Sequence, residues 1–526
     1  MGRVLGRLGD YLPAAVALAL PTVFLPIAED TFILPRVSIV VAGACLGVGL
    51  AMLAPGGPSL GAMRRPLAAA ALAAILAFVF SISWALSFAG SYTRYESLPV
   101  RLAYVGLFAA AVWLLRNQRS RDWVIGAFVL GTSIACIEAL QQWAAQVPFR
   151  PDGNLGNANV MAALIVMSLP LSVARTLRGG RFVVAWGIGA LVMVGGLVAT
   201  TSRSGGLGAL AALLILVVFS VRMRLAVAAL IASVSAVGTA VLVIALTPLR
   251  ALNDDPPTLR LHLWQDGLHM IAARPITGWG EDATGLAFGK FLSQDYASLV
   301  TFDRVHSGPL DVTAMQGLLG LAATGWVLAL LFRHAWRWRS IPDVGALSAA
   351  CAGYAVWVFV NFDWAPATGA LWLLAGTAWA AIRQAEMGAM PPATTEPALK
   401  KPTPWRSGIA IALAFAAIGL GVMPLLADVW YLQGRAQLSV VVDPLQARYH
   451  WAVGQALVAQ GSLAAGTDEL RRAADLGETE PGLYLELGDR DAQLGRTAQA
   501  RSDYRRALEI DPYYTPARER LAAAGS

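Results

Sequence analysis

The chain has 526 residues, of which 57% are hydrophobic and only 14% are charged, and its mean hydropathy is +0.58. Soluble domains carry about 25% charged residues, so this composition excludes an ordinary soluble protein and indicates a membrane protein. The net charge is +7, but Lys and Arg lie at the ends of apolar stretches and form no stripe with interleaved aromatic residues, which argues against nucleic-acid binding. Cys45, Cys136 and Cys351 all fall within apolar stretches, where we expect small packing residues.

Apolar stretches long enough to cross a bilayer recur from the N-terminus to Leu426. We therefore predict an all-α, polytopic membrane protein with about 12–13 transmembrane helices, one large external loop and a C-terminal helical-repeat tail. The predicted spans are 10–28, 34–54, 66–88, 99–115, 123–145, 158–177, 182–201, 205–221, 225–247, 309–332, 343–362, 366–383 and 407–426.

The distribution of Lys and Arg predicts the orientation, because cations in short loops stay on the cytoplasmic side. With the N-terminus inside, arginines gather in every second connection, for example near residues 64, 119, 178 and 337, whereas the opposite connections hold few cations. The expected location is the cytoplasmic membrane of a bacterium. Residues 249–308 and everything after residue 427 are then predicted to lie outside.

Four parts follow from these predictions. Residues 1–385 form the membrane body, which includes the external loop 249–308, and 386–406 form a Pro-, Ala- and Thr-rich cytoplasmic linker. Residues 407–426 are the last span, and 443–520 form the soluble tail.

The tail repeats itself with a period of 34 residues, so that Gly454 recurs as Gly488 and Ala473 as Ala507. The second copy, 481–512, resembles a tetratricopeptide repeat. Two copies are fewer than a stable solenoid usually needs, so we expect the tail to lean on the body or on another chain. Two roles stay open: docking of an acceptor or envelope protein, or a stabilising cap.

Four segments of the body carry candidate site residues. The turn 151–159 (PDGNLGNAN) offers Asn157 and Asn159 at a helix start, where donors suit sugar hydroxyls or phosphate. The turn 199–206 (ATTSRSGG) places Arg203 at the outer end of a helix pair, which is costly unless the cation is solvated, paired or functional. A bare turn and a snorkelling side chain are the structural alternatives.

The other two segments belong to the external loop. Residues 258–273 have apolar residues at helical spacing. Arg260 projects from the first turn, where the helix N-terminus adds a positive field that favours a phosphate. Residues 301–309 (TFDRVHSGP) place His306 just before a span, where imidazole can accept a proton near neutral pH. A solvated charge and a structural histidine are the alternatives.

Taken in order, these segments resemble the O-antigen ligase and polymerase family of bacterial envelope glycosyltransferases over roughly residues 60–380. The resemblance rests on the Gly-Asn-x-Asn turn, on Ser-Arg-Ser-Gly at 202–205, on Arg260-x-x-x-Trp264, on 274–280 (RPITGWG), and on Asp-Arg-x-His306 ahead of Gly-Leu-Leu-Gly. Departures from the family pattern, such as Ser307 where Asn is usual, leave ligase, polymerase and protein-glycosylating relatives open.

The resemblance implies a metal-independent enzyme without cofactors that transfers a glycan from an undecaprenyl-diphosphate carrier to an acceptor hydroxyl of a lipid, glycan or protein. It implies Arg203 and Arg260 as the diphosphate ligands and His306 as the catalytic base. Arg304 is expected either to be a third clamp or to orient the loop. The aspartates of the external loop show no metal-ligand spacing.

Two alternatives from other classes stay open, a transporter or flippase for an anionic or lipid-linked substrate, and a scaffold for envelope assembly. Against transport, we see no inverted repeat, and we take the main spans to be nearly free of ionisable residues apart from Glu138 and Asp363 near helix ends. The scaffold interpretation rests only on the repeat tail.

Overall fold

The computed structural model describes residues 2–54, 59–219, 257–296, 302–389 and 403–524, and within these ranges its regular elements are all helices. The predicted all-α class is therefore confirmed. Several helices have a proline at their first or second position, which suits a first helical turn because the missing N–H has no partner there.

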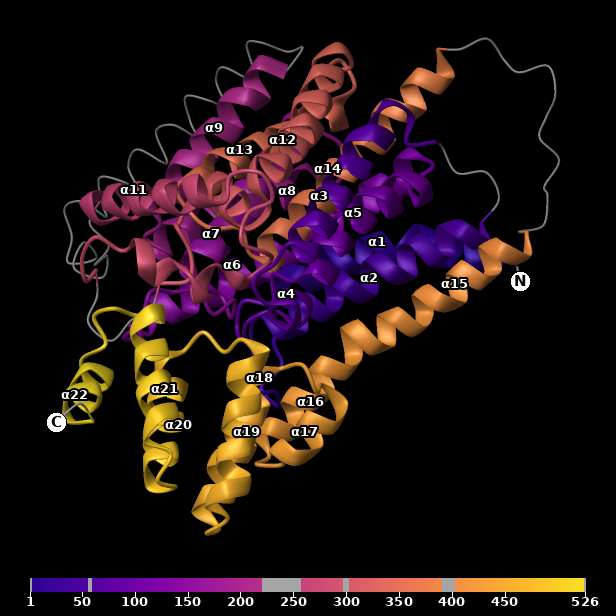
Figure 1. The fold of residues 1–526 in the computed structure, drawn as a ribbon. Helices are drawn as coiled ribbons and strands as arrows, with labels where there is room; N and C mark the ends of the chain where they lie inside the picture. Colours follow the sequence, from indigo (N-terminus) through magenta and orange to yellow (C-terminus); the bar gives the residue numbers. More distant parts are fainter. Residues whose placement is uncertain (1, 55–58, 220–256, 297–301, 390–402, 525–526) are drawn as a thin grey trace.

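The membrane body is a bundle of long apolar helices (Figure 1). They are α1 (Gly2–Thr22), α2 (Leu34–Leu53), α3 (Arg64–Val79), α5 (Leu98–Leu114), α6 (Gln118–Ala144), α7 (Ala158–Arg178), α8 (Val183–Ala199), α9 (Arg203–Phe219), α12 (Gly308–Arg337), α13 (Pro342–Phe359), α14 (Ala365–Gly388) and the rod α15 (Pro404–Ala416), η5 (Ala417–Val422) and α16 (Met423–Leu432). Within the described ranges, seven helices are long and apolar enough to cross a membrane, and four shorter apolar helices accompany them. The chain is a polytopic membrane protein.

The predicted spans coincide with described helices, except for 225–247, which lies outside the described residues. Two spans were predicted too long: the stretch 10–28 runs past the end of α1 at Thr22, and the stretch 66–88 divides into α3 and a short helix, α4 (Trp84–Ala89). The break has two causes. Ser83 caps α4 by accepting a hydrogen bond from Leu86 N, and Ile82 N donates to Trp279 O in the loop after α11.

The predicted continuous span 309–332 is also wrong, because α12 is broken at Gly317, whose φ of 67° is a left-handed conformation. The loop segment 275–280 packs into this break. Trp279 N and Gly280 N donate to the carbonyl oxygens of Ala314 and Met315, and Leu318 N donates to Pro275 O. A Cβ at position 317 would lie 2.1 Å from Ile276 O, so only glycine fits. The first turns of α12, before Gly317, thus form a short helical segment that is separate from the rest of α12 and packs against the loop segment 275–280.

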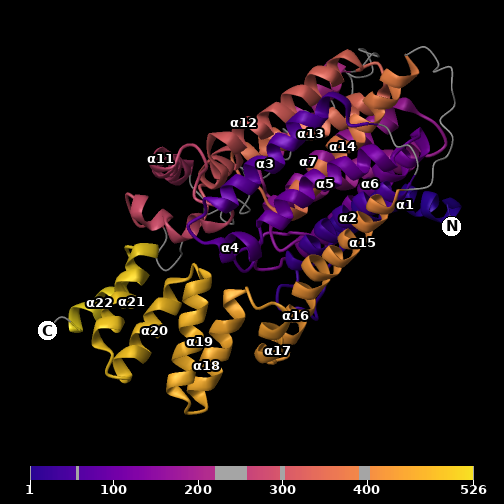
Figure 2. The same ribbon diagram turned by 45° about the vertical axis from the view of Figure 1, so that its right-hand side comes forward.

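α7 and α14 form the centre of the bundle, since most of their membrane-spanning residues are buried. The rod α15–α16 lies at the rim and is mostly exposed, which places it along the outside of the bundle in Figure 2. Its π-helical turn, 417–422, packs against α2, where a Cβ on Gly421 would lie 3.3 Å from Ser38 O.

The tail consists of α17 (Ala436–Val442) and two helix pairs, α18 (Ala447–Ala459) with α19 (Leu463–Leu476) and α20 (Pro481–Gln493) with α21 (Thr497–Ile510), followed by α22 (Thr515–Ala523). Small residues allow the close approach expected from the 34-residue period. A Cβ on Gly454 would lie 2.9 Å from Gly466 O, and a Cβ on Gly488 would lie 3.1 Å from Ala500 O.

The tail lies at the same end of the bundle as the loop residues 274–296 (Figures 1 and 2). Leu86, Ala283 and Leu286 of the body share one hydrophobic cluster with Leu483, Tyr484 and Ile510 of the tail. Asp428 fixes the junction by accepting hydrogen bonds from Asp30 N, Tyr92 OH and Tyr449 OH. The expectation that the tail leans on the body is confirmed.

Candidate active site

Two of the predicted site residues, Arg260 and His306, meet at the end of α13 that faces the loop. Arg260, in the first turn of α11 (Pro257–Ala273), donates through Nη1 to Val360 O, and the ring of Trp264 lies 6.1 Å from that of Phe359. The imidazole of His306 lies 5.2 Å from the ring of Phe362 in an edge-on arrangement. One short segment, 359–362, therefore brings together two residues that are 46 positions apart in the sequence.

Arg203 lies at the same end because α9 packs along α13. A Cβ on Gly208 would lie 3.0 Å from Gly353 O and 3.1 Å from Trp357 Cβ, so glycine permits the two helices to touch. Arg203 is the first residue of α9 and its side chain is exposed. The two helices are antiparallel neighbours, so the start of α9 and the end of α13 lie at the same end of the bundle.

His306 has a constrained backbone. Its φ is 59°, a left-handed conformation that is uncommon for a residue with a side chain. Asp311, one turn into α12, holds the backbone on both sides, accepting from Val305 N at 2.7 Å and from Ser307 N at 3.3 Å. The half-buried imidazole is also flanked by Phe302, at 6.2 Å between ring centres. The backbone of His306 is thus held in one conformation at the start of α12.

Asn157 and Asn159 have clear structural partners. Asn157 caps α7 by accepting from Asn159 N and Val160 N. Asn159 Oδ1 accepts from Ser202 Oγ at 2.9 Å and from Arg150 Nη2 at 3.1 Å, and Arg150 also donates to Thr200 O. The asparagine turn therefore supports the segment directly before Arg203, and any contact with a substrate from these two residues stays a prediction.

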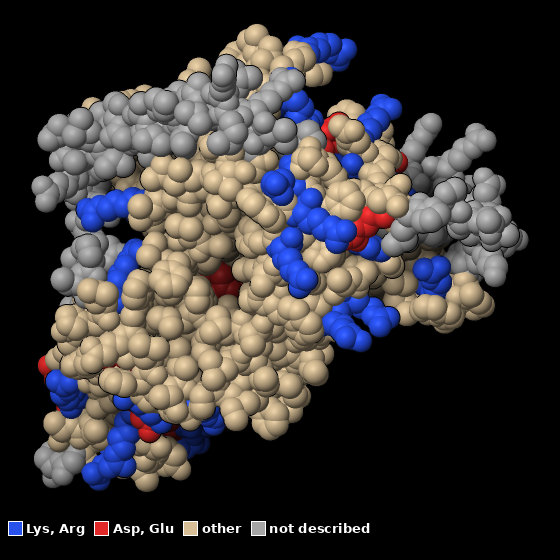
Figure 3. All heavy atoms as spheres, turned by 90° about the horizontal axis from the view of Figure 1, so that it is seen from above, with Lys and Arg blue, Asp and Glu red and all other residues tan. Residues whose placement is uncertain are grey.

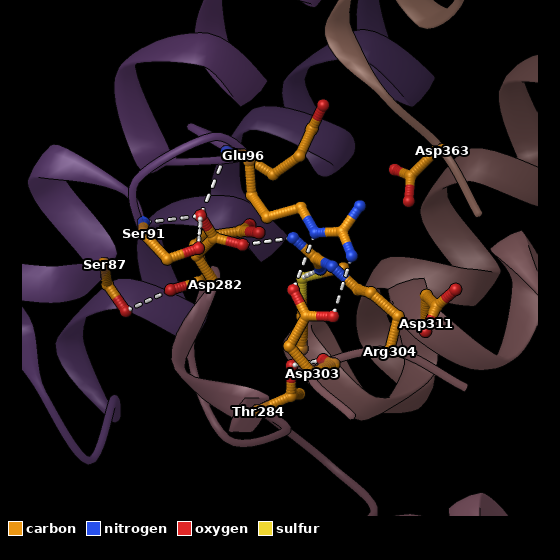
Figure 4. Close-up of polar contacts among 12 residues, drawn as sticks. Ser87, Ser91, Glu96, Asp282, Thr284, Asp303, Arg304, Asp311 and Asp363 are labelled. Carbon is orange, nitrogen blue, oxygen red and sulfur yellow. Dashed lines mark hydrogen bonds and ion pairs between the residues drawn. The ribbon is translucent and has the colours of Figure 1, made fainter. Parts of the chain in front are cut away.

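Arg304 is buried, with only 2% of its surface exposed, and forms an ion pair with Asp282. Asp282 also accepts from Ser91 N and Ser91 Oγ, and Glu96 N donates to the same carboxylate (Figure 4). These contacts fit the second of the two expected roles, orientation of the loop. Through Asp282, Arg304 therefore links the segment that carries His306 to Ser91 and Glu96 of the body.

Sequence reasoning missed a larger cluster around this ion pair, which we call the buried charge cluster. Its members are Glu96, Arg101, Glu281, Asp282, Arg304, Asp311 and Asp363. Arg101, inside α5, pairs with Glu96 at 3.4 Å, with Glu281 at 3.1 Å and with Asp363, while Gln316 Nε2 donates to Glu281 at 2.6 Å. The expectation of spans nearly free of ionisable residues is wrong, because Arg101 and Asp311 lie within predicted spans.

The electrostatics of the cluster follow from burial. Burial raises the pKa of Glu96 to about 8, and Arg101 offsets only part of this effect. Burial also raises the pKa of Glu281. Beside the cluster, burial alone would raise the pKa of Asp303, but the cations Arg94 and Arg304 together lower it to about 2. Arg94 makes a two-pronged contact with Asp303, at 2.7 and 3.0 Å.

The carboxylates are therefore engaged by arginines and by backbone N–H groups. Among the described residues, no group of His, Cys, Asp and Glu has the arrangement of a metal site. One signal in the sequence pointed to the cluster, since an arginine inside a predicted span requires a buried partner. The identity of that partner depends on how distant segments pack.

Residues 188–325 match the family model described as O-antigen ligase. The matched region runs from α8 to the middle of α12 and contains Arg203, Arg260, Arg304 and His306. It is narrower than the stretch over which the sequence motifs resemble the family. The similarity to O-antigen ligase supports glycan transfer of the ligase or polymerase type by a membrane protein. A comparison with curated protein sequences gave no match.

The O-antigen ligase region does not include the whole candidate site. The segment 359–362, against which Arg260 and His306 lie, follows it in the sequence, and Arg101 and Glu96 precede it. The body helices outside the region thus hold the region's loop in place through the buried charge cluster.

Proposed function

We propose that the protein transfers a glycan from an undecaprenyl-diphosphate-linked donor to an acceptor hydroxyl at the outer face of a bacterial cytoplasmic membrane. The observation that carries the proposal is the convergence of Arg203, Arg260 and His306 on one end of α13. Three separate segments contribute these groups, the start of α9, the first turn of α11 and the residues before α12, and all three lie within the stretch that resembles O-antigen ligase.

In the proposed reaction, His306 removes the proton of the acceptor hydroxyl. The acceptor oxygen forms a bond with the anomeric carbon of the donor sugar as the bond from that carbon to the diphosphate oxygen breaks. Undecaprenyl diphosphate leaves with the electron pair, and Arg203 and Arg260 stabilise its negative charge. Such a direct displacement inverts the configuration of the anomeric carbon.

The fixed backbone around His306 suits this role. Asp311 and the ion pair of Arg304 with Asp282 hold the segment before α12 in one conformation, so the base needs little reorganisation when the substrate arrives. The exposed Arg203 and the half-buried Arg260 lie toward the loop end of the bundle, where a carrier lipid would present its diphosphate.

The test is glycan transfer by the purified full-length protein in detergent, with a lipid-linked glycan donor and an acceptor. We expect product without added nucleotide, in the presence of a chelator, and with inverted anomeric configuration. Product that requires a metal ion or a retained configuration would contradict the proposed chemistry. Movement of the lipid-linked donor across a vesicle membrane without any transfer product would instead identify a flippase.

The proposal assigns the tail to the same outer side as the loop, where it can meet an acceptor or an envelope protein. Its support is that the tail packs on the loop end of the bundle, on Leu86, Ala283 and Leu286. Pull-down with the full-length protein, compared with a chain that ends at residue 442, tests for such a partner.

A further inference from the structure

A cavity of about 210 Å³ lies between α3, α5, α12, α13 and α14, on the side of α13 away from α9. Cys351, Ala355 and Val358 of α13 line it, whereas Gly353 and Trp357 of the same helix face α9. These two sets project from different faces of the helix. The cavity is thus separated by α13 from Arg203.

The walls and the surroundings of the mouth are apolar. Ala70 and Ala74 of α3 and Leu321, Gly325 and Leu328 of α12 line the cavity. Large hydrophobic side chains beside them are exposed, namely Leu72, Ile75, Leu318, Leu319 and Trp326. Figure 3 shows a hollow in an uncharged face of the bundle, with acidic atoms at its floor. Since these helices are membrane spans, the cavity opens to the hydrocarbon of the bilayer.

The inner end of the cavity is polar and acidic. Arg101, Gln316 and Asp363 line it, and Arg101 is paired with three carboxyl groups, so acidic groups outnumber the cation there. Within the described residues, Oδ1 of Asp363 is buried and accepts no hydrogen bond. This end is unfavourable for a diphosphate and offers an acceptor to a hydroxyl group.

The cavity also reaches the reacting region. Gly308 and Pro309, which line it, follow His306 by two and three residues, and Gly308 packs directly against Val358. An apolar space of about 150 Å³ holds a ligand the size of benzene, so this cavity has room for the head-proximal part of one hydrocarbon chain.

We propose that the cavity binds the hydrocarbon chain of a neutral, hydroxyl-bearing glycolipid, which serves as the acceptor. The lipid enters from the bilayer between α3 and α12. Its sugar lies at the acidic inner end of the cavity, on the side of His306. The donor diphosphate lies across α13, with Arg203 and Arg260. This inference rests on the proposed function and deepens it by assigning the two lipids to two faces of one helix.

The test uses Gly325, because a Cβ there meets no atom within 4 Å and a larger side chain therefore occupies the mouth without a clash. The variants are Gly325→Leu and Gly325→Trp, together with Ala355→Leu from the opposite wall. Gly408→Leu is the matched control, since Gly408 is also a helical glycine with open space but lies on the peripheral α15.

The full-length protein in lipid nanodiscs is labelled with a photoreactive alkyl glucoside, and the adducts are mapped by mass spectrometry. We expect adducts on residues 351–358 and 321–328, reduced on the order of tenfold by Gly325→Leu, as displacement of roughly two methylene groups implies. Gly325→Trp should reduce them further, and Gly408→Leu should leave them unchanged. Equal labelling of Gly325→Leu and Gly408→Leu, or no cavity adducts, would overturn the proposal.

A photoreactive polyprenyl diphosphate distinguishes the donor chain from the acceptor chain. We expect this probe to give no adducts in the cavity that depend on Gly325. Cavity adducts that Gly325→Leu removes would assign the cavity to the donor chain instead. In the transfer assay, Gly325→Leu should raise KM for a neutral glycolipid acceptor and leave KM for the donor unchanged. If the wild-type protein shows no transfer, the proposed function fails, while the labelling still decides whether the cavity binds a neutral lipid.

Discussion

Two groups of charged residues lie near the loop end of the bundle, and they differ in how they are satisfied. Arg203, Arg260 and His306 are exposed or half-buried around the end of α13. The buried charge cluster, by contrast, pairs Arg101 and Arg304 with carboxylates from three separate segments. The comparison indicates that the buried charges fix the loop on the body, and that the accessible ones face the donor diphosphate and the reacting hydroxyl.

The largest effect should come from His306→Ala. If His306 is the base, transfer falls by about two to four orders of magnitude, the usual contribution of general-base catalysis. His262→Ala and His269→Ala are matched controls, because both histidines are exposed on α11. Transfer rates are measured at equal protein level. Equal rates for all three variants would remove His306 from the mechanism.

The buried group should respond in stability rather than in chemistry. Arg101→Met leaves Glu96, Glu281 and Asp363 without their cation, and we expect a loss of about 3–5 kcal/mol in the free energy of unfolding. Arg94→Met is the control, since the Arg94–Asp303 pair is partly exposed and should cost less. Thermal unfolding in detergent measures both. A stable Arg101→Met variant with altered donor KM would move Arg101 into the substrate group.

The accessible arginines should show the opposite pattern. We expect Arg203→Ala and Arg260→Ala to lower transfer roughly ten- to a hundredfold, because each loses a charge-assisted contact of about 1.5–3 kcal/mol. Lys should restore only part of the activity, as it lacks the two-pronged guanidinium. Arg337→Ala, an exposed arginine at the far end of α12, is the control. Unchanged glycan profiles in both Ala variants would exclude these arginines from the site.

The smallest effect concerns the contact between loop and tail. A Cβ on Gly289 would lie 2.2 Å from Ile510 O, so Gly289→Val should push α21 away from the loop. We expect faster proteolysis of the tail and a severalfold loss of transfer to the native acceptor. Lys290→Ala, which removes only the exposed ion pair with Glu509, should change neither. Loss of membrane insertion in Gly289→Val would show that the tail stabilises the whole body.

The sequence alone determined the class of fold, because long apolar runs require helices in a bilayer, where every backbone polar group must be satisfied within its own segment. It also predicted α11, which covers the expected 258–273, and the close helix pairs of the tail. Both depend on local periodicity and on small residues at fixed spacing, and these features can be recognised within a short stretch of the sequence.

Only the tertiary structure decided where the charges meet. The break of α12 at Gly317 depends on the segment 275–280 packing into it, and the ion pairs of Arg101 join residues that are up to 262 positions apart. The same holds for the cavity, whose five helices come from both halves of the body. The physical reason is that a buried charge is stable only beside its partner, and the partner is set by packing between distant helices, which periodicity does not record.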